Sequence, residues 1–317
     1  MAKPLICIGE LVHASIPATG RMMRKLADSG PGAYTTDSEP LDYIKNLIES
    51  QAADGADYIA VNLDAFGESD PRTAVRMMSD YVELVRRWGR DVPICIDSSN
   101  DEVLETALVD WYESGGRVRP PLLNSVKVHT VDRILALKRR FEFSFVGLLV
   151  GDASSAGPGG SHSVEQLISL ARRIFSAAVE TYGFRAGEIF FDSTVFPLAI
   201  DMPMEPGVPG YTYRAFETIK AIRTDPAFEG VHFTMGVSNC ARDLPARKVG
   251  VSRAYVAKAM EYGLDSVIAN PAHHFGEREP DPELVRLVGA YAKMNGSTER
   301  LNEAMALMGE FCRKSRP

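Results

Sequence analysis

The stretch ADYIAVNLD, residues 56–64, carries the pattern that decides the fold, a short apolar run that ends in small polar side chains. The β-branched and apolar residues of Asp57–Asn62 predict a buried strand. A segment of helical periodicity, Pro71–Arg87, follows it, and the next apolar run, Val92–Asp97, again ends on a carboxylate. Strand, helix and strand in this order predict a unit with two parallel strands.

The same alternation continues through the chain. The eight predicted strands are Pro4–Gly9, Asp57–Asn62, Val92–Asp97, Leu122–Ser125, Ser144–Val150, Glu188–Asp192, Gly230–Gly236 and Asp265–Ala269. Amphipathic segments between them include Pro40–Asp54, Pro71–Arg87, Val164–Tyr182, Tyr213–Thr224 and Ser252–Tyr262. Eight such units without a break in composition predict an α/β protein of one domain, residues 1–317, folded as a (β/α)8 TIM barrel.

Two connections are longer than such a barrel needs, residues 10–39 after the first strand and residues 193–212 after the sixth. Both leave the carboxyl end of a strand, where barrel enzymes place their chemistry, so we expect them to form walls or lids of a pocket. The Gly-rich segment 151–163 lacks the Lys-Ser ending of a phosphate-binding loop and is expected to be a loop at the same face. Ser297–Cys312 predicts an extra C-terminal helix with Ser297 as its cap.

Composition excludes several classes of protein. Hydrophobic residues make up 45% and charged residues 24% of the 317 residues, which is typical of a compact enzyme. A net charge of -7 argues against nucleic acid as a partner. The four cysteines form no C-x-x-C motif, and no apolar run resembles a signal peptide or reaches membrane-spanning length, so we expect a soluble, cytoplasmic protein.

Several predicted strands end in a small carboxylate or carboxamide side chain. These residues are Asn62, Asp64, Asp97, Asn124, Asp192, Asn239 and Asn270. Any one of them alone is typical of a helix cap or a turn. Seven around one rim predict a shared pocket, because Asp and Asn side chains in pairs match the alternating donors and acceptors of a flat heterocycle such as a pterin.

Short motifs at these strand ends resemble one known family. They are Ile6–Glu10, Ala56–Asp64, Pro93–Asn100, Leu123–Val126, Phe190–Ser193, Gly236–Asn239 and Ala259–Asn270. Their order and placement resemble the pterin-binding methyltransferases, a family that includes methyltetrahydrofolate:corrinoid/iron-sulfur protein methyltransferases, the folate domain of cobalamin-dependent methionine synthase and, more distantly, dihydropteroate synthase. The resemblance extends over about residues 5–275.

The resemblance implies roles for these residues. Asp97, Asn124 and Asp192 are expected to hold the pterin ring, with Asn62, Asp64 and Asn270 as further contacts. Asn239 is expected to approach N5, so Asn239 and Asp192 are the implied catalytic residues. The implied reaction moves a methyl group between N5 of tetrahydrofolate and the cobalt of a cobalamin carried by a partner corrinoid protein, by an SN2 displacement with protonation or hydrogen bonding at N5. The resemblance also implies a homodimer. No bound metal is expected, because adjacent histidines such as His273 and His274 point apart in most backbones.

The chain departs from the family's pattern at two places. Family members commonly carry Arg and Asn after the first Gly-Glu, whereas this chain has Glu10-Leu11-Val12-His13. Arg242 and Arg247 follow Asn239 where simpler relatives have uncharged residues. They are expected to contact the glutamate tail of folate or the partner, or to lie in a solvated loop.

Alternative interpretations remain open. A dihydropteroate synthase would need a pyrophosphate site, and the Ser-Arg-Lys and Arg-x-His motifs for it are missing. A zinc ion held by Cys240, His273 and His274 is a second alternative. Glu10 and His13 are a possible acid-base pair, or Glu10 a structural acceptor. Rim aromatics are expected either to pack locally or to stack on a ligand, namely Phe66, Phe196, Tyr211 and Phe275. A noncatalytic pterin-binding subunit is the alternative outside enzyme chemistry.

Overall fold

A computed structural model describes residues 5–30, 32–68, 70–151, 163–203 and 205–316, and within them eight parallel strands form one sheet. The strands are β1 Ile6–His13, β2 Tyr58–Asn62, β3 Ile94–Asp97, β4 Leu122–Val126, β5 Ser144–Leu148, β6 Ile189–Asp192, β7 His232–Phe233 and β8 Ser266–Ala269. Their order in the sheet is β7-β6-β5-β4-β3-β2-β1-β8. Since β7 and β8 meet through a parallel bridge between Gly236 and Ile268, the sheet closes on itself. The predicted (β/α)8 barrel is confirmed.

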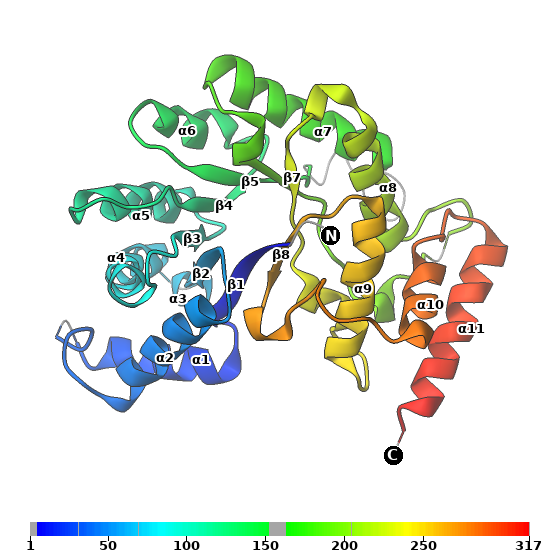
Figure 1. Ribbon diagram of the computed structural model, residues 1–317, viewed down its shortest axis with the longest axis horizontal. Helices are drawn as coiled ribbons and strands as arrows, with labels where there is room; N and C mark the ends of the chain where they lie inside the picture. Colours follow the sequence, from blue (N-terminus) through cyan, green and yellow to red (C-terminus); the bar gives the residue numbers. More distant parts are fainter. Residues whose placement is uncertain (1–4, 31, 69, 152–162, 204, 317) are drawn as a thin grey trace.

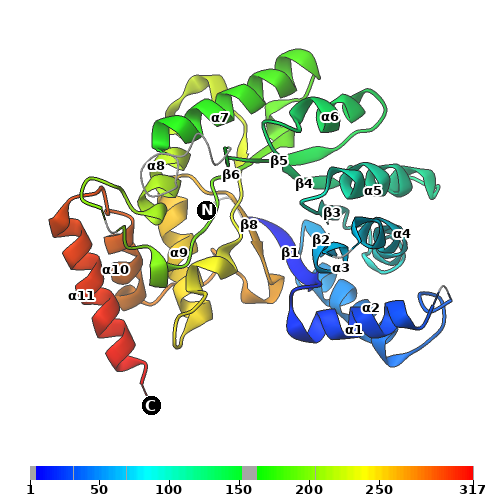
Figure 2. The same cartoon turned by 180° about the vertical axis from the view of Figure 1, so that it is seen from behind.

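Helices surround the strands on all sides (Figures 1 and 2). The α-helices are α1 Pro17–Asp28, α2 Glu39–Ala53, α3 Asp64–Gly67, α4 Pro71–Trp88, α5 Asp101–Glu113, α6 Val131–Leu135, α7 Val164–Ser176, α8 Tyr211–Thr224, α9 Lys248–Tyr262, α10 Pro282–Tyr291 and α11 Thr298–Lys314. Helices α10 and α11 lie side by side outside α9 in both views. Helix α11 is the extra terminal helix, and the Ser297 side chain caps it as predicted. Within the described residues no helix has both the length and the apolar character that crossing a bilayer requires.

The barrel interior holds a separate small apolar layer. It is made by Ile8, Ala60, Cys95, Leu122, Val146, Phe190 and Ile268, which come from seven of the strands. Successive side chains of a strand point to opposite faces, so the residue two positions further along points inward again, one level closer to the carboxyl ends. That second level consists of Glu10, Asn62, Asp97, Asn124, Leu148 and Asp192. Asn270 has the same spacing but lies beyond the end of β8. The strand period therefore places a polar ring directly above an apolar plug.

The larger core lies between the outer face of the barrel and the helices. Large side chains with less than 2% exposure fill it, among them Tyr81, Phe145, Phe216 and Tyr255. Burying a side chain of this size contributes about 1.5–3 kcal/mol relative to leaving it in water. This shell fixes the strand ends in space, so the polar ring above the plug sits on a rigid support.

The closing junction between β7 and β8 is held unevenly. At its amino end the Asp265 carboxylate accepts hydrogen bonds from Phe233 N and His232 Nδ1, both at 2.8 Å, and pairs with Arg223 at 2.6 Å. Toward its carboxyl end, Ile268 N donates to Met235 O at 2.8 Å, beside the Gly236–Ile268 bridge. Strand β7 has only two residues, so side-chain interactions supplement the short ladder.

The region predicted as a long loop after the first strand is partly regular, which corrects that prediction. Strand β1 extends to His13, four residues beyond the expected end, and α1 begins at Pro17. A register shift between Gly9 and Val12 lets β1 continue beside β2. Proline at the first helical turn starts α1. The connection after β6 remains largely irregular, with a short 3-10 turn at Leu198–Ile200. Most of the predicted Gly-rich loop, residues 152–162, lies outside the described residues.

Candidate active site

Three of the predicted residues stand in one row across adjacent strands. Asn62 of β2 is the register partner of Asp97 of β3, and Asp97 is the register partner of Asn124 of β4. Neighbouring strands lie about 4.8 Å apart, so three inward side chains in one row are held within hydrogen-bonding reach. Asn124 Nδ2 donates to Asp97 Oδ1 at 3.1 Å. Asn62 also makes a side-chain hydrogen bond to Asp97.

Asp64 is fixed beside this row by three hydrogen bonds. Its carboxylate accepts from Ser98 Oγ at 2.5 Å and from Ser99 N at 2.8 Å, while its own backbone N–H donates to Asn62 Oδ1 at 3.1 Å. The turns that follow β2 and β3 are thereby joined. Asp64 is a positioned acceptor at the edge of the ring.

Burial raises the pKa of Asp97 to about 7. The Asn62 hydrogen bond acts in the opposite direction, and the negative charges of Asp64, Glu10 and Asp192 raise the pKa further. Asp192 has a pKa raised to about 6, again by burial, with the N–H of Thr194 lowering it through a 2.7 Å hydrogen bond. Two carboxyls whose pKa values burial raises toward neutral thus line the same cavity.

Glu10 and Asn239 line the cavity beside the closing junction. Ser238 Oγ donates to Glu10 Oε2 at 3.4 Å, which links the turn after β7 to β1. Burial raises the pKa of Glu10 to about 7, and the Ser238 hydrogen bond partly offsets that rise. Asn239 lies in the 3-10 turn Val237–Ala241 and is exposed. Within the described part of the chain its side-chain amide has no hydrogen-bond partner, so it is free to bind a ligand.

These side chains line one cavity of about 750 Å³ at the carboxyl ends of the strands. Of the predicted site residues, those on its wall are Asp64, Asp97, Asn124, Asp192, Asn239 and Arg242. The four residues from β3, β4, β6 and the turn after β7 therefore share one space. A drug-sized or cofactor-sized ligand occupies about 300–1,000 Å³ in typical sites.

Three predicted site residues lie elsewhere. Asn62 supports Asp97 and Asp64 from behind and does not line the cavity. Asn270 faces a separate cavity beside Cys7 and caps the next turn by accepting from Ala272 N at 3.1 Å, because the chain leaves the strand direction at Pro271. Neither Asn62 nor Asn270 lines the larger cavity, and their contact with a ligand there stays a prediction.

Arg247 is also directed away from the cavity. Its guanidinium lies 3.8 Å from Asp281 and 3.7 Å from Glu283, over the ring of Phe311. It packs against α10 and α11 because the chain has already turned toward the start of α9. Of the two arginines, Arg242 alone lines the cavity.

Some wall residues were not among the predicted set. Lys127, Ser98, Ser99 and Ser125 line the cavity, and so do Glu10 and His13, which sequence reasoning assigned only to an open alternative. The strand period could have predicted that Glu10 points into the barrel, because it lies two residues after the interior residue Ile8 on the same strand. Lys127 lies beyond the end of β4, where the strand period no longer applies.

The proposed zinc ligands are not assembled. Cys240 is buried with its Sγ 3.6 Å from Ser252 Oγ, while His274 pairs with Glu277 at 3.5 Å beside the other cavity. Among the described residues, no group of three or more His, Cys, Asp or Glu side chains is placed to hold a metal ion. Of the rim aromatics, Phe196 stacks on Tyr211 with ring centres 4.0 Å apart.

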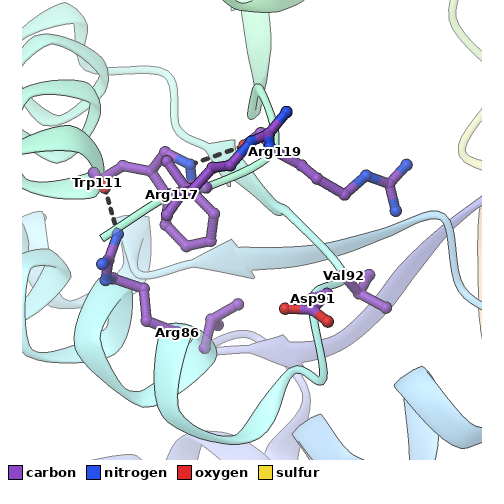
Figure 3. A pocket seen from close by; sticks show the side chains of 8 residues that line it. Arg86, Asp91, Val92, Trp111, Arg117 and Arg119 are labelled. Carbon is purple, nitrogen blue, oxygen red and sulfur yellow. Dashed lines mark hydrogen bonds between the residues drawn. The ribbon is translucent and has the colours of Figure 1, made fainter. Parts of the chain in front are cut away.

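A further cavity of about 480 Å³ lies at the opposite end of the barrel, between the connections that precede β3 and β4 (Figure 3). Arg86 donates to Trp111 O at 2.5 Å, and Trp111 Nε1 donates to Arg119 O at 3.0 Å. The side chain of Arg119 extends away from Trp111 and Arg86. These bonds tie α4 to α5 and their connection, and we interpret this cavity as structural.

A closed parallel barrel with buried carboxyls around a cavity at its strand ends defines an α/β barrel of the kind that places its chemistry at that face. The sequence profile described as pterin binding enzyme matches residues 36–270. The chain belongs to this pterin-binding family, which confirms the resemblance seen in its motifs.

Individual proteins are also similar to the chain. A methylcorrinoid:tetrahydrofolate methyltransferase from Eubacterium limosum is 24% identical over 272 residues, which cover 84% of this chain and 85% of that protein. Two solved structures are similar in fold. The dihydropteroate synthase of Coxiella burnetii in complex with pteroic acid has a TM-score of 0.51 at 11% identity, covering 92% of this chain and 94% of that one. That of Stenotrophomonas maltophilia has a TM-score of 0.50 at 16% identity, with 96% and 93% covered.

Proposed function

We propose that this protein transfers a methyl group between N5 of tetrahydrofolate and the cobalt of a corrinoid carried by a partner protein. The observation that carries the proposal is the shared cavity lined by Asp97, Asn124, Asp192 and Asn239. The name of the Eubacterium limosum relative supports the same chemistry, since it joins a methylcorrinoid to tetrahydrofolate.

The buried carboxyls suit the pterin ring. In their charged forms Asp97 and Asp192 are acceptors for the ring N–H and amino groups, and Asn124 both donates and accepts. A ligand N–H that replaces lost water would favour the charged form of each carboxyl and offset part of the cost of its burial. The buried carboxyls are therefore best paired with hydrogen-bond donors when the ring is bound.

Asn239 is the group we assign to N5. In methyl transfer to tetrahydrofolate, the N5 lone pair forms the new bond to carbon while the cobalt–carbon bond breaks and leaves its electron pair on cobalt. The proton of N5 must then be lost. A free amide that is already positioned can hydrogen-bond N5 as its charge changes, which stabilises the transition state without a strong acid.

We assign the acceptor of the N5 proton to Glu10. Its pKa of about 7 is near the range where a carboxylate both accepts and returns a proton. Ser238, the residue before Asn239, donates a hydrogen bond to Glu10. In the reverse direction, protonated Glu10 supplies the proton that makes N5 a better leaving group.

The partner is expected to dock on the rim above the cavity. Exposed apolar side chains follow β5 and β6 there, namely Val150, Phe196 and Ile200. We further propose that residues 1–317 form a single domain, that Arg242 contacts the folate tail or the partner, and that the protein acts as a cytoplasmic homodimer.

Two assays test the function. Calorimetric titration with tetrahydrofolate tests ligand class, and single-turnover mixing with methyltetrahydrofolate and free cob(I)alamin should yield methylcobalamin. Binding without methyl transfer, either to free cobalamin or to a corrinoid protein, would instead support a noncatalytic pterin-binding subunit. Formation of dihydropteroate from the pterin pyrophosphate and p-aminobenzoate, with release of pyrophosphate, would favour the synthase alternative.

A further inference from the structure

His13 is an imidazole on the wall of the strand-end cavity that none of the roles above uses. It is the last residue of β1, the register partner of Asn62, and its side chain is half-buried. Glu10, Asp64, Asp97 and Asp192 supply acceptors to the same space. A pterin also presents acceptors, its C4 carbonyl oxygen among them, and these require donors from the protein.

The local backbone fixes which nitrogen of His13 carries the hydrogen. Ser15 N donates to His13 Nδ1 at 3.1 Å. An acceptor nitrogen needs its lone pair, so in the neutral ring the hydrogen is on Nε2. Burial lowers the pKa of His13, and the nearby Asp64 opposes this only in part. The ring is therefore neutral at pH 7 and presents an N–H donor.

This donor is not used by the residues that the structure describes. Nδ1 is occupied by Ser15, whereas Nε2 has no hydrogen-bond partner in the described part of the chain. A half-buried donor without a partner is costly unless water or a ligand accepts from it.

We propose that His13 is a specificity-determining residue whose Nε2–H donates to the C4 carbonyl oxygen of the bound pterin. The inference rests on the proposed folate site. It assigns to this histidine the selection of a 4-oxo ring over a 4-amino ring, since an amino group at C4 is itself a donor and would leave Nε2–H unpaired.

Calorimetry with tetrahydrofolate and with a 2,4-diamino pteridine analogue tests this assignment. His13→Leu should weaken tetrahydrofolate binding about tenfold and leave the affinity for the diamino analogue nearly unchanged. His13→Gln, which keeps an N–H donor, should retain tetrahydrofolate binding within about threefold. His129→Leu is the control, an exposed histidine outside the cavity wall.

Nitrogen-15 NMR of histidine-labelled protein supplies a readout independent of affinity. The His13 signals, identified by their loss in His13→Gln, should show the Nε2–H form, and tetrahydrofolate should shift the Nε2–H resonance. If the wild-type protein does not bind tetrahydrofolate, the proposed function fails. If it binds but His13→Leu weakens both ligands equally, or neither, the role given to His13 is overturned.

Discussion

Asn124 and Asp97 are register partners on neighbouring strands, and the amide of one donates to the carboxylate of the other at 3.1 Å. Both also line the cavity, so the bond orients the two polar groups before any ligand arrives. Preorganisation of this kind reduces the entropy lost on binding. Hydrogen bonding from the Asn62 side chain also lowers the pKa of Asp97, although Asn62 does not line the cavity.

This difference predicts separate effects for the two asparagines. If charged Asp97, with its pKa of about 7, is the form that binds, tetrahydrofolate affinity should rise about tenfold from pH 6 to pH 8. Asn62→Ala removes a bond that lowers the pKa of Asp97, so the midpoint of this rise should move to higher pH. Asn124→Ala should weaken binding at every pH. Calorimetry across pH 5.5–8.5 measures both, and an unmoved midpoint in Asn62→Ala would contradict the supporting role of Asn62.

Asn239→Ala should slow single-turnover methyl transfer far more than it weakens folate binding. The amide is expected to act mainly as charge changes at N5, so about a hundredfold loss in rate is expected with an affinity change below about fivefold. Asn302→Ala, an exposed asparagine on α11, is the matched control. Equal losses in rate and affinity would mean that Asn239 contributes to folate binding and gives the transition state no additional stabilisation.

Glu10→Gln should remove the pH dependence near 7 from methyl transfer to tetrahydrofolate and lower its rate, because an amide accepts no proton. Ser238→Ala removes a hydrogen bond that lowers the pKa of Glu10, so the midpoint should move to higher pH. Stopped-flow rates at pH 5.5–8.5 give both midpoints. A wild-type profile that is retained in Glu10→Gln would assign the proton to another group.

Asp97→Asn should stabilise the unliganded protein at high pH while impairing pterin binding. The folded-state pKa of about 7 exceeds the usual value of 3.8, so the folded state binds more protons between these values and stability falls as pH rises through that window. Removing the charge should add about 1–2 kcal/mol to the free energy of unfolding at pH 8 and progressively less toward pH 4. Urea denaturation at the two pH values measures the difference in free energy of unfolding between variant and wild type. A difference that is larger at pH 4 than at pH 8 would contradict the predicted direction.

Gly296→Ala should destabilise the connection after β6. Gly296 has φ +93°, and an added Cβ would lie 2.7 Å from Gly207 C. Gly207 N donates to Gly296 O at 3.0 Å, and Gly210 N to Met294 O at 2.8 Å, which ties the connection after β6 to the α10–α11 turn. A loss of about 2–4 kcal/mol is expected. Gly183→Ala, with φ +75° and open space around the Cβ, is the matched control and should cost about 1 kcal/mol.

The strand period explains which parts of the site the sequence could predict. Asp97, Asn124 and Asp192 each stand two residues beyond an interior apolar residue of the same strand, so their direction follows from local geometry alone. Asn270 satisfies the same spacing, but the chain turns at Pro271 and its side chain becomes a cap. The rule fails where the strand ends.

The side-chain directions of residues beyond the strand ends depend on tertiary structure and could not be predicted from the strand period. Arg247 is eight residues after Asn239, and its direction was decided by acids on α10 that no local pattern near Arg247 reveals. Lys127 and Ser99 line the cavity through the paths of individual turns. Helix α1 was missed because its short apolar stripe follows an unexpectedly long first strand.

The junction between β7 and β8 that closes the barrel should respond to ligand binding in the cavity. Its amino end is anchored by Asp265, whereas its carboxyl end, beneath Ser238 and Asn239, depends on one bridge and the 2.8 Å bond at Ile268. Thermal separation of β7 from β8 should therefore begin at the carboxyl end of the junction, which is nearest the cavity. A flat ligand that binds both Asn239 and Glu10 would hold β7 close to β1 and β8 and oppose this separation. Hydrogen–deuterium exchange at the Ile268 amide should therefore be slower when the site is occupied.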